Sequence, residues 1–276
     1  MAQSTAATAT KGGGKAAPPT ESGRAASAAG PAMSVTGPAT EVTGSAALAV
    51  SPTDPRFLQA LRTLIFSPQL AVNYYGDQEW NYRASVPVLL GRYIAMVVRH
   101  RAVRMGVYLD EEGYVSVSDL LREQTFLNNC PDAGTFHWVV LTNPKGRFEF
   151  RVDESSREIK IRARQGHSGR NAASIDPDLA MTRVDENNLP NYCAHGTRAM
   201  YLEQIMDKGL IPGGAHRARE HVHFTTIPPN NERITGLLLH SDIVIHLDIR
   251  RWIEDGNYAW LSLNDVIVIR DTIPIQ

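Results

Sequence analysis

Apolar and polar positions follow a helical period in two parts of the N-terminal half. Residues 57–66 place apolar side chains at helical spacing after Asp54-Pro55, a common helix start. Residues 86–105 have the same spacing, with one apolar side made of Val86, Leu89, Leu90, Tyr93, Ile94, Val97 and Val98. The pattern therefore predicts two helices, and the second carries several basic residues near its end.

Shorter elements follow. Residues 116–121 read as a short helix with a serine cap. Apolar or alternating runs predict strands at 135–142, 147–152 and 158–163, and a polar turn at 153–156 joins the last two into a hairpin. Helix, helix and hairpin is the order of a winged-helix unit.

The second half, after a polar linker at 181–190, is richer in strands. We expect strands at 192–194, 221–226, 242–248 and 266–270, and a helix at 199–208 that ends at Gly209. The predicted fold class is therefore α+β, with a mixed first lobe and a mainly β second lobe.

Composition separates the N-terminus from the rest of the chain. Residues 1–50 contain 15 Ala, 7 Gly, 7 Thr, 5 Ser and 4 Pro, and the first aromatic ring is Phe57. Such a segment buries too little apolar surface to offset its ordering entropy, so residues 1–52 are predicted to be a disordered tail and 53–85 an extension. An organelle transit peptide is the alternative for this Ala/Ser/Thr-rich start.

Several classes are disfavoured by the remaining composition. No apolar run is long enough to span a bilayer, and a net charge of −1 argues against a non-specific polyanion binder. The two cysteines, Cys130 and Cys193, indicate a reducing compartment, which favours the cytoplasm or nucleus. His221 and His223 are two apart, but no carboxylate or cysteine pattern completes a zinc site, so no metal is expected.

Four short segments could carry chemistry, and each also has an ordinary interpretation. They are Arg99-His100, residues 162–168, His195-Gly196-Thr197 and residues 219–224. The alternatives are a solvated helix end, a glycine turn and a helix capped by Thr197. In the functional interpretation, arginine forks bind phosphate and a glycine lets a ligand approach the backbone.

In combination and order, these segments resemble the RNA 2′-phosphotransferase family, the NAD-dependent tRNA-splicing enzymes also called KptA. The resemblance is collinear over about residues 86–276. It rests on Val98-Arg99-His100, the glycine-led stretch 113–121, Lys145-Gly146-Arg147-Phe148, residues 162–168, His195-Gly196-Thr197, residues 219–224 and residues 262–266.

The resemblance implies a winged-helix-like RNA-binding lobe at 86–182 and an ADP-ribosyltransferase-like NAD-binding lobe at 190–276. Enzymes of this family transfer the internal 2′-phosphate of spliced RNA to NAD through an ADP-ribosylated RNA phosphate. The products are 2′-OH RNA, nicotinamide and ADP-ribose 1″,2″-cyclic phosphate. NAD is a co-substrate, no metal takes part, and the implied partner is a 2′-phosphorylated RNA, expected to be tRNA, bound by a monomer.

The resemblance also implies roles for individual residues. The catalytic tetrad falls on Arg99, His100, Arg162 and Arg219. The residues implied in NAD binding or in lining the cleft are His195, Gly196, Thr197, Gln165, His167, Ser168, His221, Ser262 and Asn264.

The chain departs from the family pattern at three places. Gly91-Arg92 replaces Ser-Lys, Asp265 replaces a glycine, and Arg164 replaces a smaller or neutral residue. Two other functions are alternatives: an ADP-ribosyltransferase that caps terminal phosphates of RNA or DNA, and a non-catalytic RNA- or NAD-binding module. The binding module predicts lost tetrad residues, whereas all four are present.

Overall fold

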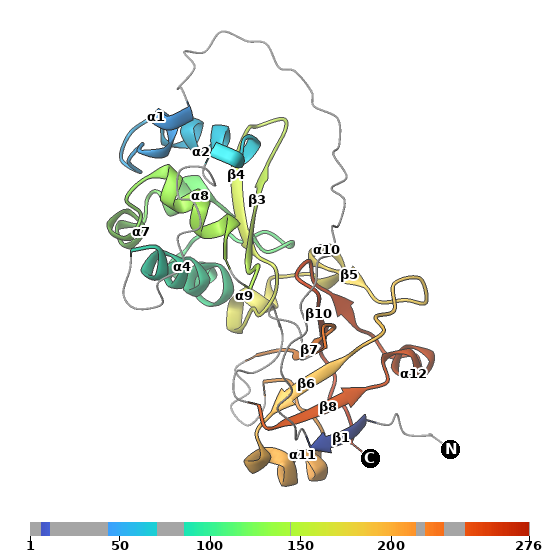
Figure 1. Ribbon diagram of the computed structural model, residues 1–276. Helices are drawn as coiled ribbons and strands as arrows, with labels where there is room; N and C mark the ends of the chain where they lie inside the picture. Colours follow the sequence, from blue (N-terminus) through green and yellow to red (C-terminus); the bar gives the residue numbers. More distant parts are fainter. Residues whose placement is uncertain are drawn as a thin grey trace, which may run out of the picture.

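Two antiparallel β-sheets, each with its own hydrophobic core, organise the protein. The computed structural model describes residues 44–70, 86–143, 145–213, 219–228 and 241–275, and the backbone of 7–11. A three-stranded sheet has the order β2-β4-β3, and a seven-stranded sheet has the order β1-β8-β6-β7-β10-β9-β5. One core draws on residues from Ala47 to Ala180 and the other on residues from Val184 to Ile273. The predicted α+β class is confirmed (Figure 1).

The first region, residues 44–180, packs helices against the three-stranded sheet. Its strands are β2 (Tyr114–Ser116), β3 (Phe148–Val152) and β4 (Ile159–Ala163). Its helices are α1 (Gly44–Leu48), α2 (Phe57–Phe66), α4 (Val86–Met96), α5 (Ala102–Met105), α6 (Val117–Leu120), α7 (Gln124–Asn129), α8 (Ala133–Leu141), α9 (Gly169–Ala173) and α10 (Pro177–Ala180).

The helix predicted at 57–66 is α2, and the helix predicted at 86–105 is α4 and α5 joined by a π-helical turn, Val97–Arg101. π-Helical turns inside α-helices are frequent at functional sites, and this one carries Arg99 and His100. The predicted apolar side is wrong at its start, because Val86 and Leu89 are exposed.

The strand predicted at 135–142 is wrong, since residues 135–141 lie in helix α8 and Thr142 is its C-cap. Asp132 caps the helix by accepting a hydrogen bond at 2.6 Å from the backbone N–H of Thr135. Every residue from Ala133 to Val140 is buried. A fully buried helix has no polar side, so its apolar run gives no period that separates it from a buried strand.

The prediction of a disordered tail over residues 1–52 fails at its C-terminal end. Ala47, Leu48 and Val50 are buried in the first core, next to α2. The backbone of β1 (Ala7–Lys11) forms one edge of the second sheet, where it pairs with β8 (Ile243–Leu247). The rest of the predicted tail lies outside the described residues.

The second region, residues 181–275, holds most of the seven-stranded sheet. Its strands are β5 (Thr182–Arg183), β6 (Ala194–Thr197), β7 (Val222–Thr225), β8 (Ile243–Leu247), β9 (Trp260–Leu261) and β10 (Val266–Ile269). Its helices are the 3₁₀ turn Ala199–Tyr201, α11 (Leu202–Lys208) and α12 (Ile249–Glu254). Gly209 ends α11 with φ +78°, as predicted.

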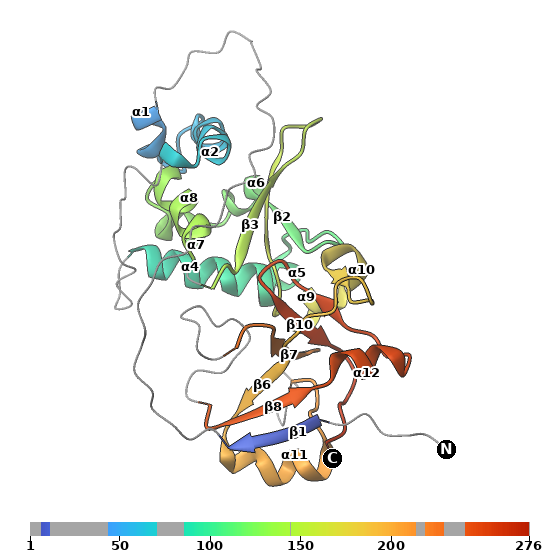
Figure 2. The same ribbon diagram turned by 45° about the vertical axis from the view of Figure 1, so that its right-hand side comes forward.

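The strand predicted at 192–194 lies further along the chain as β6, so His195-Gly196-Thr197 lies within this strand. Thr197 is therefore not a helix cap, because Arg198 occupies the N-cap position of the following turn. Both views place the lower ends of β3 and β4 toward the second region (Figures 1 and 2). None of the described helices combines the length and apolar character needed to cross a membrane.

Candidate active site

Arg99 and His100 are held against the glycine turn that follows β4. The backbone N–H of Ser168 donates to the Arg99 carbonyl at 3.0 Å, and the Ser168 hydroxyl lies 2.7 Å from His100 Nδ1. Gly166 has φ +83°, and a Cβ there would lie 2.9 Å from Arg99 Nη2. The turn therefore needs glycine both for its backbone conformation and for the close approach of the guanidinium.

Like charges surround Arg99. Burial, followed by the charges of Arg147 and Arg219, lowers the pKa of Arg99 to about 10. Burial also lowers the pKa of His100, with Arg99 and Arg219 next in effect. Arg219 itself is exposed at the start of the segment leading into β7. Gathering these cations is unfavourable without an anion, so the arrangement fits a bound phosphate.

Buried histidines lie next to these cations. Burial and the charge of Arg99 lower the pKa of His167 to about 3, and burial holds the pKa of His223 well below its ordinary value. The Nε2 atoms of both rings are buried and have no hydrogen-bond partner among the described residues. Both rings are therefore neutral at pH 7 and can hydrogen-bond a ligand.

His195 and His221, which were also predicted to lie in the site, each have a partner in the structure. His195 Nδ1 lies 2.8 Å from the His223 carbonyl, so that nitrogen carries the proton and Nε2 is an acceptor. His221 Nε2 accepts from Arg270 Nε at 3.3 Å, and burial, then the Arg270 charge, lowers the pKa of His221 to about 4. The described residues contain no His, Cys, Asp or Glu cluster suited to a metal, so they provide no support for a zinc site at His221 and His223.

Arg162 is fixed more firmly than any other predicted tetrad member. Its Nε donates to Glu149 Oε1 at 2.5 Å, and its Nη1 donates to the Glu112 and Ala180 carbonyls at 3.0 and 3.2 Å. Its guanidinium lies 4.5 Å from the centre of the Tyr114 ring, whose hydroxyl also donates to Glu149. These contacts rigidify the buried guanidinium.

Sequence reasoning missed Glu149 and Tyr114. The pairs Glu149–Arg162 and Arg151–Lys160 stand opposite each other in the β3–β4 ladder. The sequence of both strands shows charged residues at every second position. Only the strand register shows which charged side chains lie opposite each other.

Ser262 and Asn264 form a separate cluster that connects the two regions. The Ser262 hydroxyl donates to Asn264 Oδ1 at 2.9 Å, and Asn264 Nδ2 donates to the Lys145 carbonyl at 3.1 Å. The next residue, Asp265, has φ +60°. This left-handed conformation is one that glycine adopts without strain, which accounts for the glycine expected there from the family pattern.

Gly196, Thr197 and Gln165, which were also predicted to line the site, have no described contact with Arg99 or His100. Gly196 and Thr197 are buried in β6, and the Thr197 carbonyl accepts from Asp242 N at 3.1 Å. Gln165 is half-buried in the turn before Gly166. The described contacts and charge interactions therefore connect a group of residues from which Gly196, Thr197 and Gln165 are further removed. This group consists of Arg99, His100, His167, Ser168, Arg219, His221 and His223.

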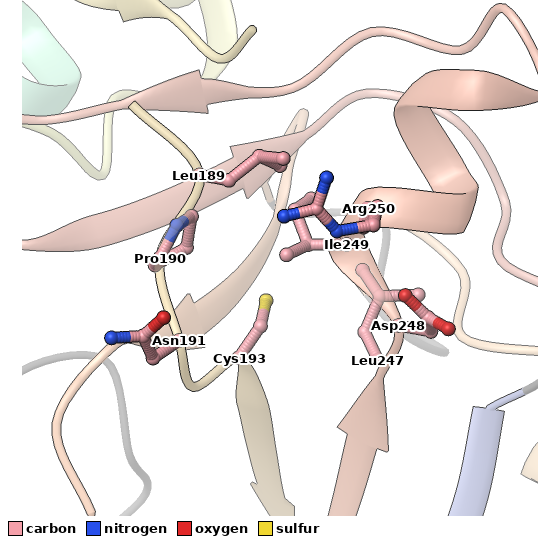
Figure 3. A pocket seen from close by; sticks show the side chains of 8 residues that line it. All are labelled: Leu189, Pro190, Asn191, Cys193, Leu247, Asp248, Ile249 and Arg250. Atoms are coloured by element: carbon pink, nitrogen blue, oxygen red, sulfur yellow. The ribbon is translucent and has the colours of Figure 1, made fainter. Parts of the chain in front are cut away.

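A cavity of about 290 Å³ opens elsewhere, where β6 begins and β8 ends (Figure 3). Its lining residues are Leu189, Pro190, Asn191, Cys193, Leu247, Asp248, Ile249 and Arg250. None of the predicted site residues lines it, and burial raises the pKa of the Cys193 thiol, which disfavours a reactive thiolate.

Sequence comparison finds a family model and several known proteins that match this chain. The sequence model described as "RNA 2'-phosphotransferase, Tpt1 / KptA family" matches residues 85–271. A tRNA 2'-phosphotransferase 1 from Danio rerio is 28% identical over 182 residues, covering 66% of this chain and 77% of the relative. A probable RNA 2'-phosphotransferase from Flavobacterium johnsoniae is 34% identical over 179 residues, covering 63% of this chain and 89% of the relative. The family match spans more than half of the chain and contains every predicted site residue, and the chain therefore belongs to the RNA 2′-phosphotransferase, Tpt1 / KptA family.

Proposed function

We propose that the protein removes an internal 2′-phosphate from RNA, with tRNA as the expected substrate, and transfers it to NAD. The products are 2′-OH RNA, nicotinamide and ADP-ribose 1″,2″-cyclic phosphate. The observation that carries the proposal is the half-buried Arg99 side chain, whose Nε is fully buried. Its guanidinium packs on Gly166 and is flanked by the charges of Arg147 and Arg219. The names of the relatives, tRNA and RNA 2'-phosphotransferases, support the same reaction.

Arg99 and Arg219 would neutralise the 2′-phosphate, which carries between one and two negative charges near pH 7. Fixed guanidiniums also stabilise charge that spreads over the phosphoryl oxygens during transfer, and such electrostatic terms are large in this chemistry. Arg162, held by Glu149 and two carbonyls, would contribute a fixed charge from the first region.

His100 is suited to proton transfer. Ser168 engages Nδ1, which leaves Nε2 to face a reacting hydroxyl or phosphate. Because burial and neighbouring arginines lower its pKa, the ring is neutral at pH 7 and can accept a proton. We assign it as the base that takes the proton from the attacking ribose hydroxyl.

The residues present fit a dinucleotide with a pyridinium ring. The buried neutral rings of His167 and His223 each offer Nε2 for a hydrogen bond to an uncharged amide or hydroxyl. Gly196 in β6 adds no side chain to obstruct a ligand. When bound, NAD supplies the ribose carbon that accepts the phosphate. We assign the second region to NAD and the first region to RNA, with ADP-ribosyltransferase-like and winged-helix-like folds respectively.

The test combines purified protein, a short RNA with one internal 2′-phosphate, and NAD, with the RNA followed by mass. NAD-dependent loss of the phosphate with formation of the cyclic product is the expected result. Accumulation of ADP-ribosylated RNA would instead indicate a capping transferase. Binding of RNA or NAD without turnover would indicate a non-catalytic module and overturn the proposal.

A further inference from the structure

One face of the three-stranded sheet carries a ladder of charged pairs. Glu149 stands opposite Arg162, and Arg151 stands opposite Lys160. The backbone N–H of Arg164 donates to the Arg147 carbonyl at 2.9 Å, which continues the ladder by one pair beyond Phe148–Ala163. Side chains two apart point to the same face of a strand, so Arg147 and Arg164 extend the charged face.

The pair at the far end of the ladder is neutralised. Lys160 Nζ lies 3.3 Å from Asp110, and Arg151 lies 3.6 Å from Asp110 and 2.6 Å from Glu112. Two cations therefore meet two carboxylates at this end, as expected for a pair that only stabilises the fold.

The pair nearest Arg99 is arranged differently. Arg164 Nε lies 3.4 Å from Glu149 Oε2, but the other oxygen of that carboxylate already accepts from Arg162 and Tyr114. Like charges directly opposite each other destabilise a sheet. The strand register therefore places two guanidinium groups on the charged face at the end that lies nearest Lys145.

Lys145 adds a third cation, and hydrogen bonds hold its backbone in place. Asn143 Oδ1 accepts from the backbone N–H groups of Lys145 and Arg147 at 3.3 and 3.4 Å, and Asn264 holds the Lys145 carbonyl. Gly146 has φ +51°, and a Cβ there would lie 3.4 Å from Arg164 Nη1. Burial and the charges of Arg147 and Arg99 lower the pKa of Lys145, in agreement with this proximity.

We propose that Arg147 and Arg164, with Lys145, form a second phosphate-binding subsite beside Arg99, which holds a phosphate group that does not react. The inference rests on the proposed function for the identity of the substrates. The ligand is an oxyanion of a phosphodiester or pyrophosphate, supplied either by the RNA backbone next to the 2′-phosphate or by NAD.

The test compares Arg164→Gln and Arg147→Gln with Arg122→Gln, which removes an exposed arginine of the first region that pairs with Asp119. The KM values for RNA and for NAD are measured separately. The salt dependence of RNA binding is measured by direct titration, which needs no turnover. Thermal unfolding of each variant monitors the fold.

Loss of one charged contact to phosphate is expected to raise one KM roughly tenfold or more and to leave kcat nearly unchanged. If RNA supplies the phosphate, the KM for RNA rises and the slope of log K against log salt falls by about 0.7 per lost contact. If NAD supplies it, only the KM for NAD rises. Arg122→Gln should behave as the wild type.

Unchanged KM values and salt slope in both variants would overturn the subsite. A drop in Tm with a fall in kcat alone would also overturn it, because it would show a structural role. An inactive wild type would instead contradict the proposed function, and the binding titration would still decide whether the subsite exists.

Discussion

The two regions contribute different chemistry to the candidate site. The first region supplies permanent positive charge, because Arg99 stays protonated at pH 7 even with its pKa lowered to about 10. The second region supplies rings from β6 and β7, His195 and His223, whose pKa values burial lowers, so they remain neutral. The first region therefore supplies most of the positive charge that can bind anions, to which the second region adds Arg219. The second region supplies most of the neutral rings, to which the first region adds His167.

The difference follows from how each sheet is buried. The first sheet has one charged face, on which Glu149, Asp110 and Glu112 hold the cations in place. Every residue of β7 is buried, and burial disfavours a charged ring there. A ligand that carries phosphate and uncharged polar groups could bind the cations with its phosphate and the neutral rings with its polar groups.

The largest expected effect comes from removing the positive charge. Arg99→Ala and Arg219→Ala should each lower kcat/KM by about 100-fold to 1,000-fold or more, as losses of transition-state charge stabilisation do. Arg183→Ala, which removes an exposed arginine stacked on Tyr258 at 4.1 Å, is the matched control. Turnover of Arg219→Ala within a few-fold of the wild type would exclude Arg219 from the site.

A second prediction concerns the contribution of residues 44–50 to the stability of the first core. A chain beginning at residue 51 loses the buried Ala47, Leu48 and Val50, whereas a chain beginning at residue 44 keeps them. We expect the shorter chain to be less stable by about 3 to 4 kcal/mol, from the apolar burial lost. Denaturant unfolding of both truncations measures the difference, and equal stability would show that residues 44–50 do not support the first core.

A third prediction tests the neutrality of the histidines. Burial lowers the pKa of His167 to about 3 and of His221 to about 4, so the unfolded chain binds more protons below about pH 6.5. Stability should therefore fall as pH decreases from 6.5 toward these values. Between pH 7 and pH 5 each ring should contribute a loss of about 2 kcal/mol.

His221→Gln sharpens this test, because glutamine cannot take up the proton but can still accept from Arg270. The variant should lose less stability than the wild type between pH 7 and pH 5, as measured by urea unfolding. Equal losses in the two proteins would show that His221 is not held neutral by the fold.

The smallest effect concerns the turn that carries Arg99. Gly166→Ala and Gly106→Ala both place a side chain at positive φ, +83° and +76°, and each should cost about 1 kcal/mol of stability. Only at Gly166 does the new Cβ meet Arg99, while the space around Gly106 is open. Turnover should therefore fall several-fold in Gly166→Ala alone, and equal turnover in both variants would show that the position of Arg99 is unimportant.

Local sequence signals located several elements well. Helix α2 spans the predicted 57–66, and Ser116 caps α6 through a hydrogen bond from Ser118 N at 3.2 Å. Such signals act within one or two turns of chain. The apolar run of α8 predicted a strand, and the composition of residues 44–50 predicted disorder. Both predictions were wrong because these segments are buried in the first core, which outweighs periodicity and composition.

The sequence by itself determined the α+β class and the family, and it predicted the residues of the candidate site, because caps, periodicity and short motifs are encoded locally. Only the tertiary structure decided that Arg147 stands opposite Arg164 and that His167 lies beside Arg99. Strand register and the packing of distant segments depend on contacts between residues far apart in the chain, and no local pattern specifies those contacts.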